Sequence, residues 1–113
     1  MAVDGCDPPY DLWCELSSNN RVKLYWEAPL YDSVSYYYIM RKANADDEWK
    51  RIRVLTPDEN EYTDYNPIGA GKCYFYRVIA KYTEPECYSP PAKAKYSDEY
   101  FCKGCSSASL YSV

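Results

Sequence analysis

Seven short runs of strand-forming residues, separated by turn signals, set the main limit on how this chain can fold. Each run carries aromatic or β-branched residues at alternate positions, whereas Pro, Gly, Asn and Asp stand between the runs. The runs are residues 11–16, 21–29, 35–43, 48–55, 61–65, 71–82 and 92–101. Short strands at this spacing predict an all-β fold, a seven-stranded antiparallel β-sandwich.

Size and charge exclude several classes of protein. A chain of 113 residues suffices for one domain with a single two-layer core. The net charge is −4, and Lys and Arg are interspersed along the sequence without a basic stripe. We therefore expect no nucleic-acid partner and no polyanion partner. No apolar run approaches the length of a membrane span, which predicts no insertion into a membrane.

The six cysteines indicate an oxidising compartment. An even number of cysteines in a small β domain is typical of disulfide-stabilised proteins that are secreted or lie at the cell surface. The pair Cys102 and Cys105 has the C-x-x-C spacing, which leaves three alternatives: structural disulfides, half of a zinc site completed by Cys14 and Cys73, or a redox-active pair. The absence of His and of a βαβ setting favours disulfides, so we predict no metal and no other cofactor.

Five stretches in order along the chain carry a resemblance to a known family. They are "PPYDLWCEL", "VKLYWEAP", "YYIMRK" with "EWKRI", "YTDYNPIGAGKCYFYRVIA" and the closing strand. Together they resemble a fibronectin type III domain, in the form common in secreted bacterial proteins. The resemblance implies an immunoglobulin-like sandwich over residues 8–101, with an N-terminal extension at 1–7 and a cysteine-containing tail at 102–113. It also implies that strands A, B and E pack on strands C′, C, F and G.

Alternation along the strands separates core residues from surface residues. The inward positions are Val22, Leu24, Trp26, Tyr37, Ile39, Tyr74, Tyr76, Val78 and Ala80. The position of Tyr74 resembles the tyrosine corner of such sandwiches, in which the hydroxyl group bonds back to the chain upstream. Tyr74 is therefore expected to be structural.

The outward positions of one sheet are unusually rich in aromatic and apolar residues. They are Tyr36, Tyr38, Met40, Trp49, Phe75, Arg77 and Ile79. Arg77 is expected to lie between Trp49 and an aromatic residue of strand C, where its guanidinium group stacks on ring faces. Two interpretations stay open: the residues shield the sheet by stacking on one another, or they form a contact surface for a neighbouring domain or protein partner.

The sequence contains no recognisable set of catalytic residues. Without His there is no imidazole for acid–base chemistry, and no Ser, Cys or Lys has a recognisable activating partner. The acidic pairs at 46–47 and 58–59 lie in predicted turns, where solvated charge is expected. We predict that the chain is not an enzyme and has no catalytic, cofactor-binding or metal-binding residues.

The topology that the resemblance implies suggests a disulfide pattern. The start of strand A and the F–G loop share one pole, and the E–F corner and the end of strand G share the other. This pairs Cys6 with Cys87 and Cys73 with Cys102, and leaves Cys14 for Cys105. The alternative for the last pair is that Cys14 is a buried free thiol and Cys105 is reactive.

The predicted function is that of a non-catalytic extracellular module of a larger protein, acting in protein–protein or adhesive contacts. The alternatives are a structural spacer between catalytic or carbohydrate-binding modules, and a cytokine-receptor-like ectodomain, which the absence of a W-S-x-W-S motif disfavours. If the partner binds through loops, the candidates are Leu30 and Tyr31 in the B–C loop and Glu84, Glu86 and Tyr88 near the F–G loop. Carbohydrate is a partner class for which the sequence offers no support.

Overall fold

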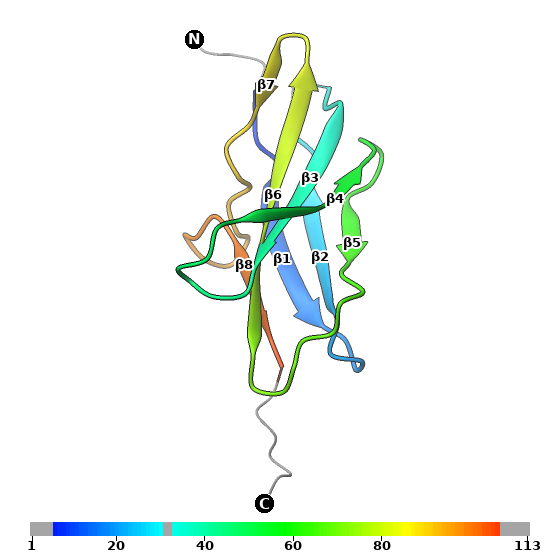
Figure 1. The fold of residues 1–113 in the computed structure, drawn as a ribbon. Helices are drawn as coiled ribbons and strands as arrows, with labels where there is room; N and C mark the ends of the chain where they lie inside the picture. The colour runs from blue at the N-terminus through cyan, green and yellow to red at the C-terminus, as the bar shows by residue number, and fades with distance from the viewer. Residues whose placement is uncertain (1–5, 31–32, 107–113) are drawn as a thin grey trace, which may run out of the picture.

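The structure, a computed structural model, describes residues 6–30 and 33–106 and consists of β-strands in two layers (Figure 1). In chain order the strands are β1 (Tyr10–Leu16), β2 (Val22–Glu27), β3 (Tyr36–Lys42), β4 (Lys50–Leu55), β5 (Glu61–Thr63), β6 (Cys73–Thr83), β7 (Glu86–Tyr88) and β8 (Cys102–Cys105). Among these described residues there is no helix, and so none that is long and apolar enough to cross a membrane.

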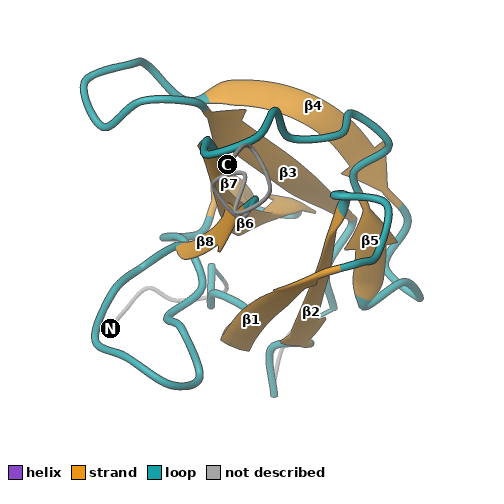
Figure 2. Ribbon diagram, turned by 90° about the horizontal axis from the view of Figure 1, so that it is seen from below, coloured by secondary structure: helices purple, strands orange, loops and turns teal. Residues whose placement is uncertain are grey.

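The strands form two antiparallel sheets that face each other (Figure 2). One sheet has three strands in the order β1-β2-β5. The other has five, in the order β4-β3-β6-β7, and β8 also pairs with β6. Strands A, B and E therefore pack on C′, C, F and G, which confirms the predicted sandwich.

The last strand differs from the prediction. Residues 92–101 were expected to form it, but β7 and β8 instead pair with the two ends of β6. Between them the chain crosses to β1, where the amide of Leu12 donates to the carbonyl of Lys93 at 3.1 Å. Pro90 and Pro91 cause the break, because neither residue has an amide hydrogen to donate to a sheet. The closing strand is therefore Cys102–Cys105, which lies in the segment that was expected to be a tail.

The core lies between the sheets and is built from the predicted inward positions. Trp26 packs edge to face on Tyr37 with a centroid distance of 5.4 Å. The other main members of the core are Leu12, Val22, Leu24, Ile39, Tyr76, Val78, Ala80 and Tyr82. Gly104 marks a close approach of the sheets, since a Cβ atom there would lie 2.5 Å from Cγ2 of Val22. Only glycine fits this position without a shift of the neighbouring strand.

A buried polar network joins the two sheets near the E–F corner. The carboxylate of Asp64 accepts hydrogen bonds from the hydroxyl of Tyr76 at 2.6 Å and from Nη1 of Arg41 at 2.7 Å. The backbone amide of Asn66 donates to the same carboxylate at 3.0 Å. Burial and the hydrogen bond to Asp64 raise the pKa of the Tyr76 hydroxyl, so it stays protonated as a donor. The bond back to the upstream chain that was expected of Tyr74 is thus made by Tyr76.

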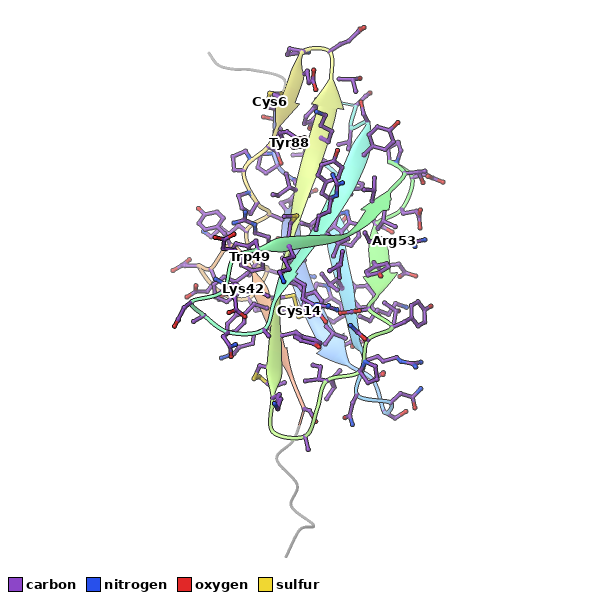
Figure 3. All side chains as sticks on the ribbon, viewed as in Figure 1. Cys6, Cys14, Lys42, Trp49, Arg53 and Tyr88 are labelled. Atoms are coloured by element: carbon purple, nitrogen blue, oxygen red, sulfur yellow. A yellow bond between two sulfur atoms is a disulfide. The ribbon has the colours of Figure 1, made fainter. Side chains whose placement is uncertain are left out.

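All six cysteines form disulfides, and the pairing corrects two of the three predicted bonds (Figure 3). Cys6 bonds to Cys87, as expected, whereas Cys14 bonds to Cys102 and Cys73 to Cys105. The shifted position of the last strand is the reason. In the β6–β8 register Cys105 lies opposite Cys73, and Cys102 lies opposite the inward residue Tyr76, so that it faces Cys14 of the other sheet.

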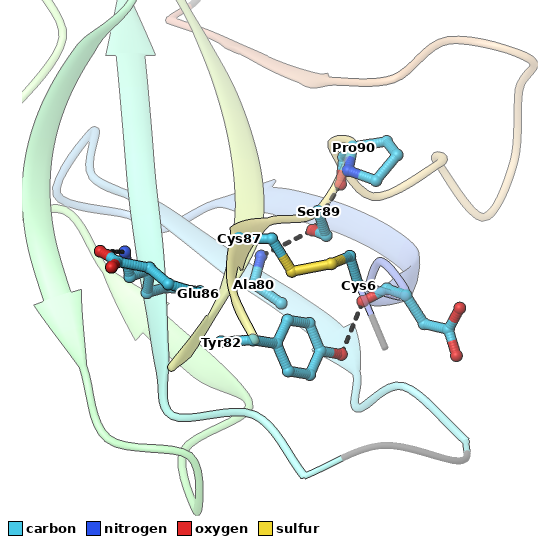
Figure 4. The surroundings of a disulfide bond; sticks show 9 residues. Cys6, Ala80, Tyr82, Glu86, Cys87, Ser89 and Pro90 are labelled. Carbon is cyan, nitrogen blue, oxygen red and sulfur yellow. Dashed lines mark hydrogen bonds and ion pairs between the residues drawn. A yellow bond between two sulfur atoms is a disulfide. The ribbon is translucent and has the colours of Figure 1, made fainter. Parts of the chain in front are cut away.

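The Cys6–Cys87 bond holds the N-terminal segment at the F–G pole (Figure 4). The hydroxyl of Tyr82 donates to the carbonyl of Asp7 at 2.8 Å, and the amide of Ala80 donates to Oγ of Ser89 at 2.9 Å. The first described residue, Cys6, therefore lies at the opposite pole from Ser106, whose amide donates to the carbonyl of Lys72.

Candidate functional site

The outward side chains of the five-stranded sheet form rows that run across the strands. The β-ladder registers define four of them: Tyr36–Lys81–Tyr88, Val54–Tyr38–Ile79, Arg51–Met40–Arg77 and Lys42–Phe75–Lys103. Six of the seven predicted outward residues fall in these rows, and Trp49 lies just before β4. The sheet thus brings together all seven residues that were predicted as partner contacts.

The first two rows form a patch that is largely apolar and open to solvent, which we call the upper patch. Its members are Tyr36, Tyr38, Val54, Ile79, Lys81 and Tyr88. The exposed fractions are 44% for Tyr36, 43% for Val54 and 57% for Tyr88. The rings of Tyr38 and Tyr88 lie 5.6 Å apart. Tyr38 and Ile79 are half-buried, and Lys81 is buried, with its ammonium group paired to Glu86 at 2.9 Å.

The other two rows carry cations and are partly covered, and we call them the basic rows. Trp49, which Figure 3 labels beside Lys42, contacts a residue of each row. Its ring lies 4.7 Å from the guanidinium carbon of Arg77 and 4.7 Å from Nζ of Lys42. Phe101, from the loop before β8, contacts both Trp49 and Phe75, at centroid distances of 6.5 and 5.5 Å. In the basic rows the residues stack on one another, which is the first of the two arrangements that the sequence left open.

Arg77 occupies the position that the sequence predicted, with one difference. Its guanidinium group stacks on Trp49, whereas Tyr38, the aromatic residue of β3 beside Met40 in the outward rows, is covered by Arg51 at 4.7 Å. Nε of Arg77 is buried and has no hydrogen-bond partner among the described residues. Burial lowers the pKa of this guanidinium group, which nevertheless stays charged at neutral pH.

The loop candidates gather at one pole. Oγ of Ser35, at the end of the B–C loop, lies 3.0 Å from Oγ1 of Thr83, at the start of the F–G turn. Leu30 is 69% exposed, and Glu84 and Glu86 are exposed as well. Tyr31 lies outside the described residues. Two of the loop candidates join the upper patch: Tyr88 is a member of it, and Glu86 pairs with its residue Lys81.

An aromatic cluster on the other sheet was missed by sequence reasoning. The ring of Trp13 stacks on that of Tyr25 at 4.3 Å, and Tyr96 packs edge to face on Trp13 at 6.5 Å. The alternation of Trp13 with the inward residues Leu12 and Cys14 was the signal that could have placed it outside. Tyr96 had no such signal, because it belongs to the connection that crosses to β1.

The disulfide pattern removes the two chemical alternatives for Cys102 and Cys105. Each of them is bonded to a cysteine of another strand, and the two are not bonded to each other. The four sulfur atoms of the proposed zinc site thus belong to two separate disulfides. Within residues 6–30 and 33–106, no group of three or more His, Cys, Asp or Glu side chains converges on a position for a metal ion.

Several solved structures share this fold at low sequence identity. A fibronectin type III-like protein from Clostridium thermocellum aligns with a TM-score of 0.68 and 19% identity over 88% of this chain and 92% of its own. Domains A168–A170 from titin align with a TM-score of 0.70 and 24% identity over 92% of this chain and 33% of theirs. The FN1–FN3 domains of chicken CNTN1 align with a TM-score of 0.70 and 19% identity over 90% of this chain and 31% of theirs. No protein-family model matches the chain.

Proposed function

We propose, from the fibronectin type III fold of the chain, that it is a non-catalytic module of a larger extracytoplasmic protein and contacts a neighbouring domain or protein partner through the upper patch. One observation carries the proposal: Tyr36, Val54 and Tyr88 are all exposed on adjacent rows of one sheet face. Tyr is among the residues that are enriched in protein interfaces, and large contiguous apolar patches on soluble proteins mark interaction sites.

The architecture supports a module that is joined to other domains. This chain aligns with 33% of the titin structure and 31% of the CNTN1 structure, so in both of them the matching region is one part of a longer chain. Cys6 and Ser106 lie at opposite poles of the sandwich, so further domains on both sides would be arranged end to end. The same placement favours a second candidate function, that of a spacer between domains.

The disulfides support the extracytoplasmic assignment. Three bonds close loops with sequence separations of 81, 88 and 32 residues. Disulfides of this number persist in oxidising compartments and are rare where thiols are kept reduced.

A photo-crosslinking experiment tests the contact surface. A photoreactive phenylalanine analogue replaces Tyr88 in the full-length parent protein, and Tyr65, which is 67% exposed on another part of the surface, is the matched control position. We expect one defined adduct from position 88, to a neighbouring domain or partner, and its loss in the Tyr36→Ser background. Equal adducts from both positions, or none from position 88, would contradict the proposal and leave the spacer function.

A further inference from the structure

The five-stranded sheet is basic although the protein is acidic. Its strands hold eight of the 13 Lys and Arg residues: Arg41, Lys42, Lys50, Arg51, Arg53, Arg77, Lys81 and Lys103. Their only acidic residue is Glu86. The strands of the other sheet hold one basic residue, Lys23, and four acidic ones. Five of the eight fall in the outward rows: Lys42, Arg51, Arg77, Lys81 and Lys103. Sheet pairing thus assembles a basic outer face that the linear order of the residues conceals.

Most of the outward cations on this sheet are not neutralised. Of the five outward cations, all of them described residues, only Lys81 forms an ion pair, with the carboxylate of Glu86. Lys42 donates instead to the backbone carbonyl of Ala45 at 3.0 Å, and Arg51 and Arg77 lie over aromatic rings. Such contacts hold the cations in place but leave their charge available to an anion.

In the basic rows a cation, an apolar residue and a second cation follow one another across three strands. Arg51 and Arg77 flank Met40, and Lys42 and Lys103 flank Phe75. Nζ of Lys42 and Nζ of Lys103 lie 6.0 and 5.7 Å from the centre of the Phe75 ring. The two cations of a row are two strand spacings apart, or about 9–10 Å between Cα atoms.

A hollow beside Phe75 extends this basic surface toward the E–F corner. It has a volume of about 570 Å³, within the usual range of small-ligand sites. Lys72 and Lys103 line it together with Phe75 and the backbone at Gly69 and Gly71. None of its lining residues is acidic. Asp47 borders it, since its carboxylate accepts from the backbone amide of Asn44, a lining residue, at 3.0 Å. Asp47 and Glu48 line a second hollow of about 460 Å³, together with Lys42.

We propose that the basic rows and this hollow bind an acidic polysaccharide in which carboxylate-bearing sugars alternate with neutral sugars. A chain that crosses the strands along Lys42, Phe75 and Lys103 meets a cation, an apolar ring and a cation in turn. The Cα spacing of the two basic residues in a row is comparable to the length of a disaccharide unit in an extended polysaccharide. Lys72 adds a third ammonium group at the end of this path.

The alternation argues for a polysaccharide over the other polyanions. A single nucleic-acid strand stacks its bases on open aromatic faces between its phosphate contacts. In the basic rows Met40 has no ring, and Phe75 is half-buried and packs against Phe101 at 5.5 Å, so neither row offers an open ring face for a base. An apolar sugar face can pack on the exposed parts of such residues, while its carboxylate reaches the flanking ammonium group. An acidic peptide would also satisfy the cations, and the experiment includes it.

The test measures binding of a hyaluronan hexasaccharide, whose sugars alternate between acidic and neutral, by isothermal titration calorimetry. The controls are a neutral N-acetylglucosamine hexamer, a poly-glutamate peptide and a single-stranded oligonucleotide. We expect hyaluronan to bind, the neutral hexamer not to bind, and the affinity to fall as ionic strength rises. Poly-glutamate or oligonucleotide binding as tight as that of hyaluronan would overturn the assignment, as would no hyaluronan binding.

Two matched variants locate the site. Lys103→Gln, on the basic rows, is expected to weaken hyaluronan binding by roughly tenfold, as for the loss of one charged contact. Lys95→Gln changes an exposed lysine outside the five-stranded sheet and is expected to leave the affinity unchanged. Unchanged thermal unfolding of both variants shows that the fold is kept. An equal effect of the two substitutions, or no effect of Lys103→Gln, would overturn the proposed site.

Discussion

The outer faces of the two sheets differ in how their charged side chains are paired. On the three-stranded sheet, Lys23 pairs with Glu61 at 3.6 Å, and the hydroxyl of Tyr25 donates to Glu15 at 2.8 Å. On the five-stranded sheet, cations lie over aromatic rings and meet almost no carboxylates. On the first face these charged side chains pair with neighbours on the same face. On the second face most cations have no carboxylate partner among the described residues and are the proposed anion-binding groups.

The second face is itself divided. The basic rows are partly covered by Trp49 and Phe101, whereas the upper patch exposes Tyr36 and Tyr88. Both interpretations that the sequence left open, stacking and contact surface, thus have a counterpart on this face. The covered part supports the cations, and the open part is the proposed contact with another protein or domain.

The largest expected effect comes from removing the buried carboxylate of Asp64, which pairs with Arg41 on the inner side of the five-stranded sheet. In Asp64→Ala, Arg41 and Tyr76 both lose their acceptor. We expect unfolding to become easier by about 3–4 kcal/mol, the lower part of the range for breaking a buried ion pair, because the Arg41 side chain is still 20% exposed.

Chemical denaturation measures this change. Asp64→Asn is the companion variant, since an amide oxygen can still accept from Tyr76, and it should cost less than Asp64→Ala. If both variants unfold like the unsubstituted protein, the network does not hold the two sheets together as described.

A smaller effect is expected from the ring that lies between the cations. Trp49→Leu keeps an apolar side chain but removes the ring face that Arg77 and Lys42 contact. We expect a loss of about 1–2 kcal/mol in the free energy of unfolding, as for two partly exposed cation–π contacts. Denaturation at low and high salt measures it. Stability equal to that of the unsubstituted protein would mean that the cations on this face do not depend on the ring.

The smallest effect is expected on the three-stranded sheet. Glu61→Gln removes an exposed ion pair with Lys23, whose side chain is 36% exposed, and such pairs contribute about 0–1 kcal/mol. The substitution also lowers the negative charge beside Lys23. If it cost as much as Asp64→Ala, the contrast between exposed and buried pairs in this protein would be wrong.

Alternation and turn residues were enough to predict the two sheets and the inward residues, because a one-residue shift would turn every core side chain to solvent. They also placed the seven outward residues on one face. The last strand could not be predicted, since its position depends on where the chain returns to β6 after Pro90 and Pro91. Two disulfides were mispaired for the same reason.

The charge of the five-stranded sheet was hidden for a different reason. Lys42, Arg77 and Lys103 are far apart in the sequence, and only the ladder registers bring them into neighbouring rows. A linear search for a basic stripe therefore predicted no polyanion partner, although the folded sheet assembles a basic surface.

The contrast between the two faces is tested most directly by mapping backbone amide chemical shifts during titration with the hyaluronan hexasaccharide. We predict saturable shifts at Lys42, Lys72, Phe75 and Lys103, and none at Glu15, Lys23, Tyr25 and Glu61 of the opposite face. Shifts that centre on the three-stranded sheet, or that spread evenly over both faces, would contradict the account.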